Sequence, residues 1–277
     1  MGTLTIKSTY SQVFPKVEIV THLLIRRQFY RKIGARSLSK LLRESFTCLR
    51  WFCHELWHHV NPQQQPSFEK DYNSLITRSL PSTLRELFIF EDFNKLLHPE
   101  RSTKRANPSL GRALSKSSRF LENLSAAFLV DAEDFFANLR PSNQQSLNIG
   151  RAKINRLLIA AGRAAAFMPK LEIMEIWNGG EEHACIFRYR NGTKEPKITW
   201  KCNWSRRVRL DPNVVNCWAD LPRHGGNLTA VVDRIRRPPK LVKTHSTAIR
   251  YLQTRRAIVD PISGCQLFLE ECDQLKN

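Results

Sequence analysis

Apolar residues recur along the first two thirds of the chain in a short, repeated pattern. Each segment has an apolar residue, a second one three positions later and a third two positions after that, or comes close to it. The segments begin at Val17, Leu49, Leu84, Leu121 and Leu171. The last position of the first two is a histidine, His22 and His54. Side chains alternate between two faces along a strand, so these segments are predicted to be short strands.

Helical periodicity fills the intervals between these segments. Leu38, Leu41 and Leu42 fall on one face of a helix, with Ser37 as the expected N-cap. The same spacing predicts helices within residues 68–81 and 146–169. Pro15, Pro81 and Pro169 each precede a repeat strand, and proline favours extended backbone before it.

Strand and helix alternating at a roughly fixed period indicate a stacked repeat fold. The intervals are longer and less regular than in usual leucine-rich repeats. We therefore expect an α/β protein whose residues 1–169 form an irregular leucine-rich-repeat-like solenoid. The basic segment at about 98–119, rich in serine and proline and poor in apolar residues, is expected to be a surface loop.

The pattern changes at about residue 170. Residues 170–277 are expected to form a strand-rich C-terminal cap, continuous with the repeats. Asn178-Gly179-Gly180 reads as a tight turn with positive φ at both glycines, and Asn191-Gly192 as a second turn. Asp211 and Pro212 open a predicted helix that Gly225 closes. Residues 248–252 read as a helix or strand, and 258–259 as a last strand.

The charge of the chain is strongly positive. It has 277 residues, with 44 Lys+Arg against 25 Asp+Glu and a formal net charge of +19. This balance favours an anionic partner, although a basic surface without a dedicated site gives the same count. No apolar run approaches the ~20 residues of a membrane span, and the first residues lack a secretory apolar region. The seven scattered cysteines are then expected to be reduced thiols of an intracellular protein, cytoplasmic or nuclear.

One pentapeptide has the residue spacing of zinc hydrolases. His54-Glu55-Leu56-Trp57-His58 would place both histidines on one face of a helix, with Glu55 as general base. The repeat pattern instead puts His54 on a strand, which removes the shared face. Asn61 and Gln64 stand where the extended motif needs glycine and histidine. We therefore predict no metal centre at His54, Glu55 and His58, and no cofactor.

Two further groups of residues are candidates for binding. Glu181, Glu182 and His183 could form an acid/base cluster after the turn, although a polar loop that caps the sheet is the favoured explanation. The candidate binding residues around this turn are Trp177, Asn178, Gly179, Gly180, His183, Arg188 and Tyr189. The candidate basic patch comprises Lys104, Arg105, Arg112, Arg206, Arg207, Arg209, Arg234, Arg236 and Arg237. Trp200, Trp204 and Trp218 near these arginines could stack on bases, but they are predicted to be core residues.

Three landmarks give the chain a family resemblance: Trp177-Asn178-Gly179-Gly180, the segment 184–189 and His245 to Ile249. They resemble the C-terminal region of a group of fungal proteins, many described as F-box proteins, whose upstream repeats are similar to residues 84–94. The resemblance covers roughly 15–262 and implies no catalytic residues. Too few residues precede Val17 to hold an F-box, so it does not imply a ubiquitin-ligase role here.

These observations leave three functional hypotheses. The first is a non-enzymatic protein-interaction scaffold that binds through the strand side of the solenoid. The second is a basic nucleic-acid-binding protein. The third is an accessory enzyme, with or without a metal, which rests on the 181–183 cluster and the histidine pentapeptide. The sequence specifies neither the partner nor the oligomeric state.

Overall fold

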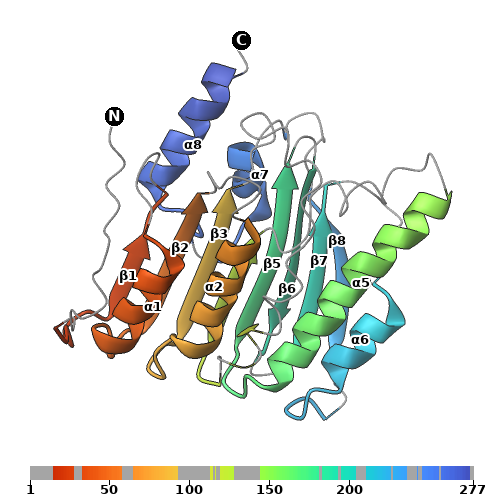
Figure 1. Cartoon of the computed structure of the whole chain (residues 1–277). Helices are drawn as coiled ribbons and strands as arrows, with labels where there is room; N and C mark the ends of the chain where they lie inside the picture. Colours follow the sequence, from red (N-terminus) through yellow and green to blue (C-terminus); the bar gives the residue numbers. More distant parts are fainter. Residues whose placement is uncertain are drawn as a thin grey trace.

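The chain folds around one mixed sheet with helices on both faces (Figure 1). The structure is a computed structural model, and it describes residues 15–27, 33–57, 65–92, 113–114, 116, 119–127, 144–180, 183–192, 195–203, 210–225, 227–235, 242, 245–255 and 257–274. No helix in these ranges is both long enough and apolar enough to cross a membrane.

Eight strands form the sheet, and their order in space is their order in the chain. The strands are β1 (His22–Ile25), β2 (Trp51–Trp57), β3 (Glu86–Asp92), β4 (Asn123–Ala127), β5 (Ile173–Gly180), β6 (His183–Arg190), β7 (Lys197–Cys202) and β8 (Thr229–Arg234). Strands β1 to β5 are parallel, β5–β6 and β6–β7 are antiparallel, and β7–β8 are parallel. The fold is therefore mixed α/β, with an open sheet.

Six helices lie in the described ranges. They are α1 (Ala35–Glu44), α2 (Gln65–Arg78), α5 (Gln144–Ala166), α6 (Pro212–Ala219), α7 (His245–Leu252) and α8 (Pro261–Gln274). Figure 1 shows α1, α2, α5 and α6 on one side of the sheet, which we call the helix face. The opposite side, the arm face, is covered by the C-terminal arm, defined as the described residues from His245 to Gln274.

The predicted strand register is confirmed for four of the five repeat segments. Pairing of Trp51 with Glu86, Glu86 with Asn123, and Asn123 with Ile173 brings Leu49, Leu84, Leu121 and Leu171 into line. The first segment was wrong by three residues, because His22 pairs with Trp51 and this aligns Val20 with Leu49. Residues 17–20 instead form a turn, in which Val20 N–H donates to the Val17 carbonyl at 3.3 Å.

The start of each parallel strand repeats one hydrogen-bond arrangement. The carbonyl of Arg50 accepts from Arg85 N–H and Glu86 N–H, at 2.8 and 3.0 Å. Thr21, Arg85 and Glu122 carbonyls each accept from two successive N–H groups of the next strand in the same way. The starts of β2 to β5 are thus each fixed by backbone bonds to the preceding strand, whatever the side chains are.

The helix face holds the larger apolar core. Strand residues such as Phe52, Leu87 and Met174 pack there against Leu38 of α1 and Leu75 of α2. The predicted helices are confirmed in these positions, although α1 begins at Ala35 with Gly34, and not Ser37, as its N-cap. In α6 the predicted cap is confirmed, since Asp211 Oδ1 accepts from Asn213 N–H at 2.8 Å. Gly225 has φ +55°, but α6 ends before it at Ala219.

The arm face has a second, smaller core. Phe90, Trp177 and Ile186 of the strands pack there with Leu252 and Ile258 of the C-terminal arm. The expected last strand at 258–259 was wrong, because these residues cross the sheet and lead into α8, which the sequence pattern did not predict. The expected surface loop at 98–119 lies largely outside the described residues, but Ala113 and Leu114 are buried in the helix-face core.

Candidate functional site

The predicted tight turn after Trp177 is in fact strand. Gly179 and Gly180 belong to β5 and pair with Ala184 and His183. Positive φ at these glycines was wrong: among the described glycines only Gly225 has it. The Asn178 side chain is buried and accepts from Gly179 N–H at 2.8 Å, so its carbonyl oxygen serves the backbone. Glycine within a strand allows another backbone to approach closely, as β6 does here. The Asn-Gly-Gly sequence is therefore compatible with a strand and does not require a turn.

The candidate binding residues 177–189 do not converge on one surface. Trp177 and Arg188 point to the arm face, where Trp177 stacks on Phe90 with ring centroids 6.0 Å apart. Tyr189 points to the helix face. Strand alternation separates neighbours in this way, so these residues cannot form a single pocket. Glu181 and Glu182 lie outside the described residues, as does the His183 side chain, so the acid/base cluster stays a prediction.

Arg188 is bound within the structure. Its Nε lies 2.6 Å from Glu175 Oε1 on the paired strand β5, and its Nη2 donates to the Gln253 carbonyl at 2.7 Å. Glu175 is buried and also accepts from Arg255 N–H at 3.3 Å. Gln253 has φ +49°, an unusual conformation for a residue other than glycine, and it directs the arm toward this ion pair. Arg188 and Glu175 therefore attach the C-terminal arm to the sheet.

Tyr189 belongs to an aromatic and basic cluster under α6. Its hydroxyl is 2.9 Å from His224 Nε2, its ring packs on Trp218 at 4.8 Å, and the Arg223 guanidinium lies 5.5 Å from the ring centre. Burial raises the pKa of the Tyr189 hydroxyl to about 12, against the lowering effect of Arg223. Burial, and secondarily Arg223, lower the pKa of the His224 imidazole. Both shifts favour the neutral forms, the phenol of Tyr189 and the imidazole of His224. Tyr189 therefore has a packing role in this cluster.

Residues 54–57 of the histidine pentapeptide lie in β2, so the strand predicted for His54 is confirmed. His54 lies on the helix face, where it stacks on Phe52 and contacts Tyr72 of α2. Glu55 lies on the arm face and accepts from Arg27 N–H at 3.0 Å and Asp260 N–H at 2.7 Å. His58 is outside the described residues. The first histidine and the glutamate therefore project to opposite sides of the sheet and cannot share a metal or a substrate.

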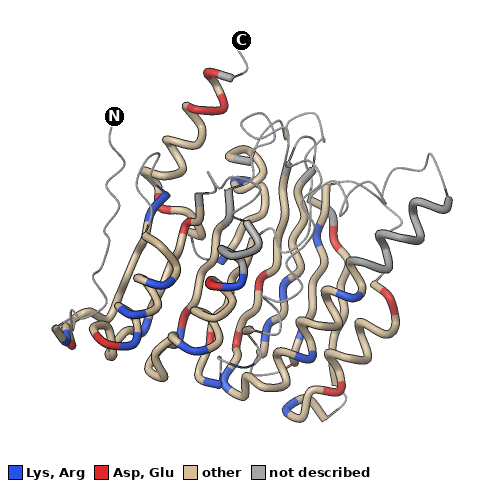
Figure 2. Tube along the Cα trace, in the orientation of Figure 1, with Lys and Arg blue, Asp and Glu red and all other residues tan. Residues whose placement is uncertain are grey.

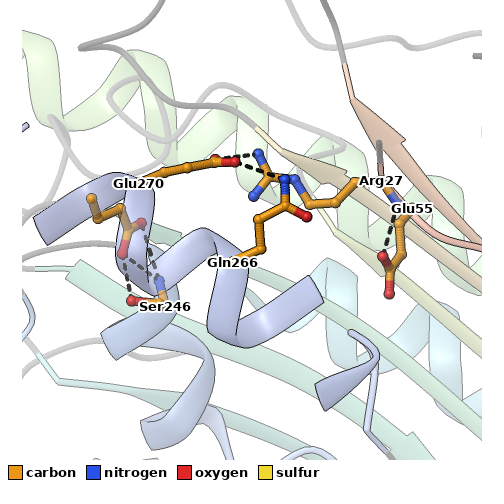
Figure 3. A network of polar contacts seen from close by, with 6 residues as sticks. Arg27, Glu55, Ser246, Gln266 and Glu270 are labelled. Atoms are coloured by element: carbon orange, nitrogen blue, oxygen red, sulfur yellow. Dashed lines mark hydrogen bonds and ion pairs between the residues drawn. The ribbon is translucent and has the colours of Figure 1, made fainter. Parts of the chain in front are cut away.

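Glu55 is part of a buried polar network that the sequence did not reveal (Figure 3). The Arg27 side chain is buried, and its Nη2 lies 2.8 Å from Glu270 Oε2 of α8. Gln266 donates to Glu270 at 2.9 Å, and Glu271 accepts from the hydroxyl and the N–H of Ser246 in α7. Its contacts between the sheet and the C-terminal arm, Arg27 with Glu270 and Glu55 with Asp260, span more than half of the chain, so no local spacing could signal them. Every carboxylate in it holds a segment of the C-terminal arm.

The predicted basic patch falls almost wholly outside the described residues. Arg234 ends β8, but its side chain is not described, and the other eight residues lie in segments the structure does not describe. A different set of basic side chains is exposed on the outer side of the helix layer. Its members are Arg43, Lys70, Arg78, Arg156 and Arg163. Figure 2 shows basic positions recurring along α1 and α5.

The described side chains offer little for catalysis. No group of three or more histidine, cysteine or acidic residues in the described ranges could hold a metal ion. Burial raises the pKa of the Cys53 thiol to about 12 and also raises that of Cys217, which disfavours a thiolate nucleophile at either position. Trp200 and Trp218 are buried, as predicted, while Trp204 lies outside the described residues.

The fold and its contacts define a mixed α/β protein whose described buried charged groups bind other segments of the same chain. Residues 79–260 match a family of unknown function, DUF6546, and the chain belongs to this family. The matched segment begins before β3 and ends before α8. No curated protein and no solved structure matches the chain.

Proposed function

We propose that the chain is a non-catalytic scaffold that binds an acidic protein surface through the outer side of its helix layer. The observation that carries this proposal is the contrast between the two layers. The charged residues of the arm face are buried in structural contacts, whereas basic residues of the helix layer face outward. Two acidic side chains in that layer are already engaged, since Glu44 pairs with Lys40 at 3.9 Å and Asp71 with Arg36 at 2.9 Å.

The repeat architecture supports a scaffold. Five parallel strands in chain order, with the same paired hydrogen bonds at the starts of β2 to β5, are what stacked strand-helix units produce. We therefore retain an irregular leucine-rich-repeat-like solenoid as part of the proposal, with fungal F-box-associated proteins as its proposed relatives. The strand side, first expected to bind the partner, is occupied by the C-terminal arm, so we assign binding to the other side.

Charge reversal on the helix layer tests the proposal. The variant Arg43→Glu, Arg78→Glu, Arg163→Glu is compared with a control of equal charge change, Arg50→Glu, Arg190→Glu, Lys197→Glu, at exposed strand ends. Binding of a labelled polyglutamate peptide is followed by fluorescence anisotropy. The helix-layer variant is expected to weaken binding by about tenfold, ~1.4 kcal/mol, and the control by about twofold or less.

Two results would contradict the proposal. One is wild-type protein that does not bind the acidic peptide, or equal losses in both variants. The other is much tighter binding to a labelled RNA of the same length and charge, with the steep salt dependence of phosphate contacts. That result would favour the nucleic-acid-binding hypothesis.

A further inference from the structure

Two cysteines on consecutive strands face one another across the sheet. Cys185 of β6 is the register partner of Cys202 of β7. Both are in the thiol form, and their exposed fractions are 0% and 1%. Both belong to the helix-face core, so their side chains leave the sheet on the same side.

The hydrogen-bond alternation of this hairpin brings the two side chains together. Asn203 N–H donates to the Ala184 carbonyl at 3.1 Å, so residues 184 and 203 form a hydrogen-bonded pair. The neighbouring pair, Cys185 and Cys202, is then of the non-hydrogen-bonded type, in which the α-carbons are closest, at about 4.5 Å. A disulfide needs α-carbons about 4.4–6.8 Å apart, so this register permits one without moving the backbone.

Two other buried or half-buried cysteines of the described chain lack this arrangement. Cys53 faces Leu24 and Phe88 on its neighbouring strands, and its thiol donates to the Ile258 carbonyl at 3.6 Å. Cys217 lies in α6 and donates to the Ile159 carbonyl at 3.5 Å. Neither Cys53 nor Cys217 thus faces a second thiol on a neighbouring strand, as Cys185 and Cys202 do.

We propose that Cys185 and Cys202 form a latent cross-strand disulfide, a redox modification site that locks β6 to β7. The oxidant is a small-molecule disulfide such as oxidised glutathione. One cysteine thiolate attacks it and forms a mixed disulfide, releasing one glutathione thiol. The second cysteine thiolate displaces the other glutathione, so two protein thiols are oxidised to a disulfide, one glutathione disulfide is reduced to two glutathione thiols, and these take up the two protons that the protein thiols lose.

Burial determines when this reaction takes place. The surroundings raise the pKa of the Cys185 thiol, mainly by desolvation and secondarily through Cys202, which disfavours the thiolate in the folded chain. Oxidation therefore occurs while the strands are open, during folding or transient unfolding. Once formed, the disulfide is shielded by the same core and resists reduction in the folded protein.

Oxidative refolding with peptide mapping tests this inference. The full chain is refolded from guanidinium in a mixture of oxidised and reduced glutathione, the remaining thiols are alkylated, and non-reduced peptides are identified by mass spectrometry. We expect a linked peptide joining Cys185 to Cys202 as the dominant product, and a melting temperature higher than that of the reduced protein by about 5 °C.

Two variants make the result specific. Cys185→Ala should remove the linked peptide and the temperature shift, whereas Cys217→Ala should retain both. Alkylation of both Cys185 and Cys202 in refolded wild-type protein would overturn the proposal, as would a dominant link from either residue to the exposed Cys265. Because the wild-type map decides alone, poor folding of a variant does not affect the test. Folded protein treated with oxidised glutathione should react much more slowly than refolding protein.

Discussion

The two faces of the sheet are closed by different physical means. On the helix face, apolar strand residues meet apolar residues of helices that precede or follow each strand directly. On the arm face, one segment from the end of the chain crosses from β6 to β1 and is fixed by carboxylates as well as by apolar contacts. Local repeats thus form the first face, and contacts between distant segments complete the second.

This difference sets the energetic role of charge in the molecule. A buried ion pair adds little net stability, but losing one partner leaves an uncompensated charge and is costly. The helix face should therefore respond to lost volume, and the arm face to lost polar partners as well as to lost volume. The predictions below separate these two responses.

The largest effect is expected from Arg188→Ala. This substitution leaves the buried Glu175 carboxylate without its guanidinium and should lower the free energy of unfolding by about 3–5 kcal/mol in urea denaturation. The double variant Glu175→Met, Arg188→Met removes both charges and should lose markedly less. If the single variant costs no more than the double one, the ion pair does not attach the arm as we infer.

Adjacent residues of β3 compare the two faces directly. Ile89 packs on the helix face and Phe88 on the arm face, and both are buried. Ile89→Ala should cost about 2–5 kcal/mol and Phe88→Ala about 3–5 kcal/mol. Leu269→Ala on α8, where the side chain is 62% exposed, is the control and should change stability by less than about 0.5 kcal/mol. A harmless Phe88→Ala would mean that the arm face of β3 is open to solvent.

Glu55 tests the arm without changing side-chain volume. Glu55→Gln keeps the shape but removes the charge that receives Arg27 N–H and Asp260 N–H, and should cost about 1–3 kcal/mol. Glu44→Gln, in an α1 ion pair at the surface, is the matched control with an expected change below about 0.5 kcal/mol. Equal values for the two, measured by urea denaturation, would argue against a structural role for the Glu55 charge.

The smallest effect concerns pH and the helix face. Because the pKa of His224 is lowered in the folded protein, the unfolded chain takes up this proton first as the pH falls. Its contribution is complete above the unfolded value of about 6.5 and is lost as the pH falls toward the folded pKa. His224→Gln should therefore lose less stability than wild type between pH 7.5 and pH 5.5. Identical pH slopes would show that burial does not perturb this imidazole.

The sequence predicted the helix face well because its signals are local. Alternation around Leu84, Leu87 and Ile89 and the helix between Tyr72 and Ile76 need only neighbours in the chain. Strand placement of His54 followed from the same alignment. The first repeat was misplaced because the segment beginning at Val17 comes close to the pattern. Val20, Leu23 and Ile25 fit it fully, and these are the residues in register with β2.

The contacts of the arm face could not be predicted from local sequence patterns. Glu55, Glu175 and Arg188 look like surface residues in a sequence, since charged side chains are seldom buried. Their burial depends on a segment that follows by as much as 205 positions, the separation between Glu55 and Asp260. In β3 the residues on both faces are apolar, so the strand appears in the sequence as a continuous apolar run. Alternation therefore does not predict that the arm face of β3 is covered by a separate segment.

Amide hydrogen exchange at single residues examines the closure of the arm face most directly. The N–H groups of Arg27 and Asp260 donate to the Glu55 carboxylate, and that of Arg255 donates to Glu175. By NMR, all three should exchange slowly in wild-type protein, and Glu55→Ala should accelerate Arg27 and Asp260 while leaving Arg255 protected. Rapid exchange of Asp260 in the wild type would show that the C-terminal arm is not held on the sheet by this carboxylate.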